Sequence, residues 1–202
     1  EAELATSSFG QGFTCTMVQE AAAFCSVING GYYYKPHVVS SITDSSGAVV
    51  ETIDSVVERQ VISSSVSDTV REYLGSVLES GGTGTAAKVE GYSMGGKTGT
   101  AQKIPRDAGT YLVSYIGFAP LDDPQVVVYV VVDEANSDNQ SNSAYAQSIA
   151  KNIFTELLPY MNIFPDEGTA SGTDTVGEPE QGIEDTSVPE PPASTQDETV
   201  ES

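Results

Sequence analysis

The sequence predicts an α+β fold in which helices flank an antiparallel sheet and a disordered tail follows. Helical patterns enclose extended segments joined by short loops, and short loops favour antiparallel over parallel strands. A further observation separates the tail, because after residue 162 the composition turns to Pro, Glu, Asp, Thr, Ser and Gly, with no Lys or Arg. We therefore expect a folded part at residues 1–162 and an acidic, disordered tail at residues 163–202.

The first strong helix is expected between residues 16 and 29. Apolar side chains recur there at helical spacing: Met17, Ala21, Phe24 and Ile28. Thr16 and Gln19 form a capping-box pattern at its start, and the segment Asn29–Gly31 ends it. This helix should therefore have well-defined ends.

Residues 32–53 are predicted to be extended, and the turn Asp44–Gly47 predicts a hairpin between two β-branched runs. A second helix begins in the serine cluster Ser63–Ser67 and stops at Gly81–Gly82. Its expected apolar residues are Val66, Val70, Tyr73, Leu74, Val77 and Leu78.

The remaining elements are three strands and a closing helix. The strands are expected around Lys97–Lys103, Tyr111–Phe118 and Gln125–Asp133. The helix should run from about Ser143 to Leu158. Its expected buried stripe is Tyr145, Ile149, Ile153 and Leu157. Ser148 and Lys151 would then lie on its polar flank.

Composition excludes several classes of function. The formal net charge is −21, with 8 Lys plus Arg against 29 acidic residues, so nucleic-acid binding is not expected. His37 is the single histidine, which excludes a multi-histidine metal site, and we predict no metal and no cofactor. The longest apolar run, Val126–Val132, is too short to span a bilayer. Cys15 and Cys25 are ten residues apart on or beside one helix, too far apart for a disulfide, and should be unpaired.

The segment Gly91–Lys103 supports two incompatible hypotheses. Gly91–Thr98 matches the G-x-x-x-x-G-K-[ST] phosphate loop, and Asp133 at the end of an apolar run could hold magnesium. That loop requires a helix to open at its Lys-Thr, because the helix N-terminus binds the phosphates. The continuation through Gly99, Thr100, Ala101 and Pro105 disfavours a helix, so this nucleotide-binding protein is the alternative hypothesis.

In the favoured hypothesis the same residues form a strand. Alternation then places Thr98 and Thr100 on one face, while small residues beside Lys97 let another chain approach the backbone. Two hydroxyls and an ammonium suit the binding of a peptide carboxylate, and a free backbone N–H can face an oxyanion.

At these residues the chain resembles a known family. Lys97-Thr98-Gly99, followed by Thr100-Ala101-Gln102, resembles the third signature motif of penicillin-binding transpeptidases and serine β-lactamases. The similarity extends in order to other segments of class B penicillin-binding proteins: Phe9–Gly31, Lys35–Val39, Asp44–Val50, Glu79–Lys103 and Ser143–Glu167.

The resemblance implies a partial β-lactamase/transpeptidase-like fold, the C-terminal half of a D,D-transpeptidase domain. It implies cross-linking of peptidoglycan stem peptides ending in D-Ala-D-Ala, acylation by β-lactams, and partners in the cell-wall synthesis machinery. Lys97 would supply charge, Thr98 and Thr100 would bind the terminal carboxylate, and Gly99 would keep the strand uncrowded. The backbone N–H of Thr100 would be an oxyanion donor. The whole protein would lie on the outer face of the bacterial cell membrane.

One departure limits the resemblance. The family's S-x-x-K and S-x-N motifs stand upstream of Lys-Thr-Gly, whereas here Ser148–Lys151 and Ser137–Asn139 match these patterns downstream and in reversed order. Such short patterns occur by accident. We expect that the chain begins within the domain, that the nucleophile, its base and a membrane anchor lie upstream, and that the chain alone is inactive. A non-catalytic interaction module of the same fold is a further alternative.

Overall fold

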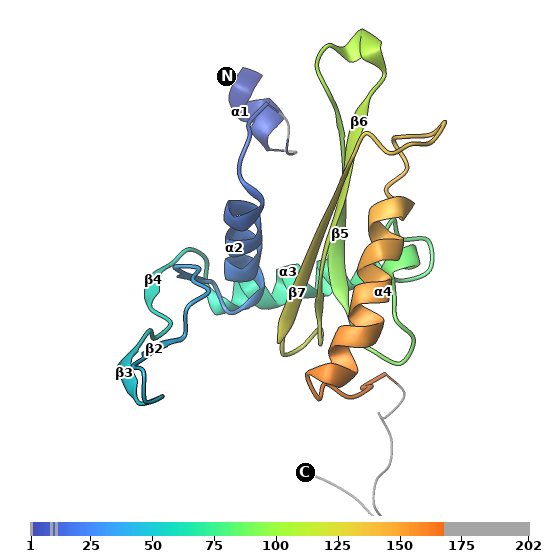
Figure 1. Ribbon diagram of the computed structural model, residues 1–202. Helices are drawn as coiled ribbons and strands as arrows, with labels where there is room; N and C mark the ends of the chain where they lie inside the picture. Colours follow the sequence, from blue (N-terminus) through green and yellow to red (C-terminus); the bar gives the residue numbers. More distant parts are fainter. Residues whose placement is uncertain (1, 9, 11, 168–202) are drawn as a thin grey trace, which may run out of the picture. The chain divides into compact units, whose positions relative to one another are not determined.

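The computed structural model describes residues 2–8, 10 and 12–167, so most of the predicted tail lies outside the described residues. Its centre is an antiparallel sheet of three strands in the order β5-β6-β7: β5 (Gly95–Gln102), β6 (Tyr111–Ala119) and β7 (Val126–Asp133). Helix α4 (Ala144–Tyr160) and helix α2 (Met17–Ile28) lie on opposite sides of this sheet (Figure 1). The predicted α+β class is confirmed.

The main core lies between the sheet and α4. Tyr115, Ala119, Val128 and Val130 of the sheet share one buried cluster with Phe154 of α4. On the other face, Phe24 of α2 meets Phe118 of β6 with ring centroids 6.0 Å apart. The sheet is thus covered on both faces along β6, as expected for its nearly all-apolar sequence.

The buried stripe of α4 differs from the expected one. Its buried residues are Ala146, Gln147, Ala150, Phe154 and Leu158. Ile149 and Ile153 of the expected stripe are 44% and 41% exposed, so that prediction was wrong by one position along the helix. The two rows are neighbours on the helix surface, and the row with two alanines faces the sheet because small side chains let the backbones approach.

Helix α2 begins and ends where the sequence predicts. Thr16 and Gln19 form the complete capping box, and Asn29 is the C-cap. A short helix, α1 (Ala2–Ser7), precedes it. Beyond α2 the chain forms two small ribbons away from the sheet (Figure 1). They pair β1 (Tyr32–Tyr34) with β4 (Val57–Gln60) and β2 (Ser41–Thr43) with β3 (Val49–Thr52).

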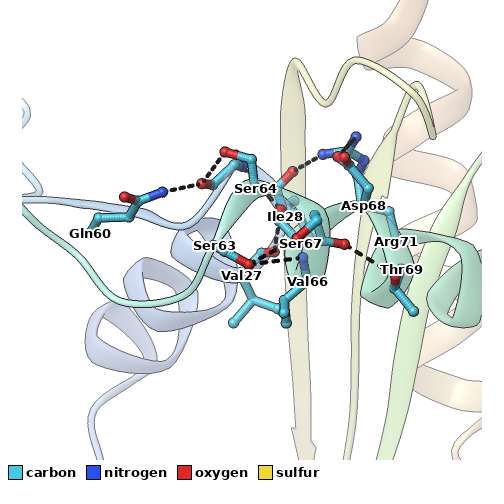
Figure 2. Close-up of polar contacts among 12 residues, drawn as sticks. Val27, Ile28, Gln60, Ser63, Ser64, Val66, Ser67, Asp68, Thr69 and Arg71 are labelled. Carbon is cyan, nitrogen blue, oxygen red and sulfur yellow. Dashed lines mark hydrogen bonds and ion pairs between the residues drawn. The ribbon is translucent and has the colours of Figure 1, made fainter.

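Helix α3 (Ser64–Ser76) begins in the predicted serine cluster, with Ser63 as its N-cap, but it ends before the predicted stop at Gly81–Gly82, and its buried face includes polar groups. Ser67 is fully buried, donates to the Val27 carbonyl at 2.7 Å and accepts from the Gly30 N–H at 3.0 Å (Figure 2). Arg71 donates to the Ile28 carbonyl at 2.9 Å. The expected apolar residues Val66 and Tyr73 are instead 47% and 69% exposed. The prediction was therefore wrong at these two positions, whereas Leu78 lies in the main core as expected and Val70, Leu74 and Val77 are partly buried.

Two short 3-10 turns, η1 (Thr85–Ala87) and η2 (Arg106–Ala108), precede and follow β5. After α4, the segment 163–167 binds back to the loop before β5. Backbone N–H groups of Asp166 and Glu167 donate to the Gly91 carbonyl at 2.9 and 3.0 Å, and the Tyr92 hydroxyl donates to the Ile163 carbonyl at 3.2 Å. Of the helices in the described ranges, none is long and apolar enough to cross a bilayer.

Candidate functional site

The candidate site is built on β5, where Gly95–Gln102 form one continuous strand. Within the described residues, β5 pairs only with β6, which leaves its other edge open. No helix opens at Lys97 and Thr98 in this described strand, so the segment lacks the helix N-terminus that a phosphate loop requires. The geometry therefore opposes the nucleotide-binding alternative.

The register divides the motif between the two faces of the sheet. Thr98 is opposite Tyr115, and Thr100 follows two residues later on the same face, the face that α4 covers. Lys97 is opposite Ile116 and, with Gly99, belongs to the other face. The prediction that the two threonines share a face is confirmed.

Lys97 stands at a groove of about 460 Å³ on the α2 side of the sheet. The groove is lined by Glu20 and by residues of all three strands, among them Gly99, Ser114, Ile116 and Tyr129. The ammonium of Lys97 donates to the Thr98 carbonyl at 2.9 Å. The cation is thus held along the strand, at the boundary between the groove and the open edge.

Both threonine hydroxyls contact neighbouring loops. Thr98 Oγ1 lies 3.1 Å from Thr83 Oγ1, and either oxygen could be the donor. Thr100 Oγ1 donates to the Ser141 carbonyl at 3.4 Å. Sequence reasoning missed Thr83 and Ser141, which lie 15 and 41 residues from their partners. The glycine-rich sequence around Thr83 was the available signal for this contact, because glycines allow a loop to pack closely against a neighbouring element.

The downstream serine motifs lie elsewhere. Ser148 and Lys151 are exposed on α4, as their predicted polar flank requires, and the Ser148 hydroxyl donates to the Ala144 carbonyl at 2.8 Å. Ser137 lies in the loop before α4, with its hydroxyl 2.6 Å from the Tyr145 hydroxyl. Its partner in the pattern, Asn139, donates a backbone N–H to Ser137 Oγ at 3.3 Å. These hydrogen bonds account for both patterns as local helix and loop structure.

The acid that the nucleotide hypothesis assigned to magnesium is ion-paired. Asp133 lies 2.9 Å and Glu134 lies 2.6 Å from the ammonium of Lys103. Hydrogen bonding to Glu134, and then to Asp133, raises the pKa of Lys103 above its ordinary value. Among the described residues, no group of three or more His, Cys, Asp or Glu side chains is arranged to hold a metal ion. Cys15 and Cys25 are free thiols.

Comparison with known proteins identifies the family. The family model described as "Penicillin binding protein transpeptidase domain" matches residues 2–156. The chain belongs to this transpeptidase family. It is 41% identical over 167 residues to Stage V sporulation protein D of Bacillus subtilis, an alignment covering 81% of this chain and 26% of that protein. It is 31% identical over 180 residues to the probable peptidoglycan D,D-transpeptidase PenA of Neisseria flavescens, covering 88% of this chain and 42% of the relative.

A solved member of the family has the same fold. The structure described as the apo TP domain of Burkholderia pseudomallei penicillin-binding protein 3 matches with a TM-score of 0.68 and 29% identity. The match covers 82% of this chain and 48% of that one. The chain therefore spans less than half the length of these relatives.

Proposed function

We propose that this chain supplies the substrate-binding wall of a D,D-transpeptidase that cross-links peptidoglycan stem peptides. The observation that carries the proposal is the arrangement on β5, where two threonine hydroxyls share one face of an open-edged strand and a lysine stands beside them. Membership of the transpeptidase family supports the same conclusion.

In this proposal, Thr98 and Thr100 bind the terminal carboxylate of a D-Ala-D-Ala peptide, with the charge of Lys97 close by. Hydroxyl and ammonium donors to a carboxylate form charge-assisted hydrogen bonds, which are stronger than neutral ones. The Lys103 N–H donates to the Thr110 carbonyl, so by the alternation of an antiparallel ladder the backbone groups of Thr98 point away from β6, where the Thr98 carbonyl accepts from Lys97. Because residues two apart on a strand direct their backbone groups the same way, the Thr100 N–H is expected at the same open edge as an oxyanion donor.

The attacking serine is proposed to come from a part of the domain other than the described residues, because Ser148 is bound within α4. Its oxygen would form an ester with the penultimate D-alanine carbonyl as the peptide C–N bond breaks. The terminal D-alanine would leave with the proton of the serine. The amine nitrogen of a second stem peptide would then form an amide bond with the same carbonyl carbon as the ester bond breaks, and the serine oxygen would regain a proton from that amine. The protein would work at the outer face of the bacterial membrane with the cell-wall synthesis machinery, and β-lactams would acylate the same serine.

A fluorescent penicillin tests this proposal on the full-length protein. The wild type should be labelled covalently, and Lys97→Ala should lower the labelling rate about tenfold or more, as expected for loss of a charged donor. Lys103→Ala is the matched control, since Lys103 follows the same strand but pairs with Asp133 and Glu134, and its rate should stay within about twofold.

Three outcomes would contradict the proposal. Equal labelling rates for the wild type and Lys97→Ala would show that Lys97 does not take part in the site. Absence of labelling in a folded full-length protein would favour the non-catalytic interaction module. Labelling of the 202-residue chain at Ser148 would instead assign the nucleophile to α4.

A further inference from the structure

We propose that Thr83 is a positioning residue for Thr98, and that Gln147 of α4 holds Thr83 in place. This inference rests on the proposed function, because it assigns Thr98 to the substrate carboxylate. It adds to the candidate site a loop and a helix that lie outside the Lys-Thr-Gly motif.

The contacts form a continuous chain from the helix to the strand. Gln147 is 3% exposed, and its amide Nε2 donates to the Thr83 carbonyl and to Ser143 Oγ, each at 3.0 Å. Thr83 Oγ1 then lies 3.1 Å from Thr98 Oγ1. A buried amide that spends both N–H groups on a loop carbonyl and a serine fixes that loop closely, because leaving them unpaired would be costly.

The loop that carries Thr83 is also tied down on both sides by its backbone. The Gly82 N–H donates to the Glu79 carbonyl at 2.8 Å, and the Gly84 N–H donates to the Val77 carbonyl at 2.9 Å. A Cβ on Gly82 would lie 2.1 Å from the Val77 carbonyl oxygen, so this close approach requires glycine. Thr83 is therefore presented to β5 by a loop with little freedom to move.

The direction of the hydrogen bond between the Thr83 and Thr98 hydroxyls follows from the number of protons that each can donate. A threonine hydroxyl has one proton to donate and lone pairs to accept. If Thr98 gives its proton to the carboxylate, its oxygen can only accept from Thr83. The Thr83 hydroxyl thereby turns the Thr98 proton towards the substrate and polarises it, as linked hydrogen bonds do. Thr100 differs, because its partner is the Ser141 carbonyl, which can only accept, so the Thr100 proton has to turn away from that carbonyl to reach a carboxylate.

The test uses acylation of the full-length protein by a penicillin with a free carboxylate and by the methyl ester of the same penicillin. Thr83→Val keeps the shape and removes the hydroxyl. We expect it to lower the acylation rate for the free acid about tenfold and to leave the rate for the ester within about twofold. Thr83→Ser should restore the wild-type preference for the acid. Thr85→Val, an exposed neighbour in η1, is the matched control and should change neither rate.

Gln147→Glu provides a second variant, because it replaces an amide donor by an acceptor facing the Thr83 carbonyl. It should also reduce the preference for the acid, with an unfolding midpoint measured alongside to show that the protein is folded. If Thr83→Val lowers the acylation rates for the acid and the ester equally, or lowers neither, the inference is overturned. Labelling of the wild type would still uphold the proposed function in that case. Failure of the wild type to react with either compound would overturn both.

Discussion

Removal of one buried hydroxyl at the junction of α2 and α3 should destabilise the protein strongly. Ser67 is fully buried, and its hydroxyl serves two backbone groups at the end of α2: the Val27 carbonyl at 2.7 Å and the Gly30 N–H at 3.0 Å. Carbonyls in the last turn of a helix have no partner within the helix. Ser67→Ala therefore leaves one donor and one acceptor without this partner.

The magnitude follows from those two groups. A buried polar group left unsatisfied costs about 1–3 kcal/mol. Arg71 still holds the neighbouring Ile28 carbonyl at 2.9 Å, so the junction is weakened rather than lost, and we expect a loss of about 2 kcal/mol in the free energy of unfolding. With a urea m-value of about 2 kcal/mol/M, the unfolding midpoint falls by about 1 M.

Urea unfolding followed by circular dichroism measures this change in the wild type and two variants. Ser65→Ala is the matched control, because Ser65 is exposed on the same helix and its hydroxyl lies 3.0 Å from the exposed hydroxyl of Ser63. It should be neutral or gain a few tenths of a kcal/mol from the helix propensity of alanine. Equal midpoints for the two variants would refute the reasoning. Amide exchange at Gly30 should also accelerate in Ser67→Ala alone.

Three further predictions concern the sheet and the hairpin. Tyr115→Phe should change the free energy of unfolding by less than about 1 kcal/mol, because the buried Tyr115 hydroxyl has no hydrogen-bond partner among the described residues. A loss above about 2 kcal/mol in urea unfolding would contradict this, since it would mean that the hydroxyl has a hydrogen-bond partner. Gly96→Ala should lower the free energy of unfolding by about 1–3 kcal/mol, since its Cβ would lie 2.4 Å from the Tyr115 hydroxyl oxygen. Gly99→Ala should cost less, because its Cβ would meet, at 2.5 Å, the Ser114 hydroxyl, which can rotate away. Equal thermal unfolding midpoints for the two variants would contradict this. The Asp44 pKa should lie below its ordinary value of 3.8, because the Ser46 hydroxyl and then backbone N–H groups of the turn bind the carboxylate. Because the pKa of Asp44 is lower in the folded state, the ionised carboxylate stabilises the turn at pH values above the ordinary pKa of 3.8. This stabilisation is lost as the pH falls through the lower, folded-state pKa. An NMR titration of Asp44 measures that pKa.

Elements with local signals could be predicted from the sequence. The capping box of Thr16 and Gln19, the Asp44–Gly47 turn and the start of α3 in the serine cluster each depend on neighbours within a few residues. The three strands and α4 also formed at the expected places. Local hydrogen bonding fixes these features before any packing is known.

The packed faces could not be predicted as well. On α4 the row of large side chains looked like the buried one, but Ala146 and Ala150 face the sheet. On α3 a serine is buried because its partner is the end of another helix rather than an apolar surface. Likewise, the motif at Lys97 was visible in the sequence, whereas the contact between Thr83 and Thr98 depends on where a distant loop packs. Periodicity reports which residues share a face but not what that face meets.

The glycines of β5 show how the strand serves packing and access at once. From the sequence, small residues beside Lys97 were interpreted as room for an approaching chain. In the structure, a Cβ on Gly95 would lie 2.5 Å from the Phe118 ring, and one on Gly96 would lie 2.4 Å from the Tyr115 hydroxyl oxygen, so these two are required by packing within the sheet. Gly99 lines the groove and meets only the end of one side chain.

Access to the backbone is therefore concentrated at Gly99, between the two threonines of the proposed carboxylate site. Thr98 and Thr100 face the α4 side of the sheet, whereas Lys97 and the groove lie on the α2 side. Beside the motif, these two faces meet along the open edge of β5. In the proposed function, a peptide whose carboxylate is held by the threonines runs along that edge, and the attacking serine approaches it from the groove side, where Lys97 stands.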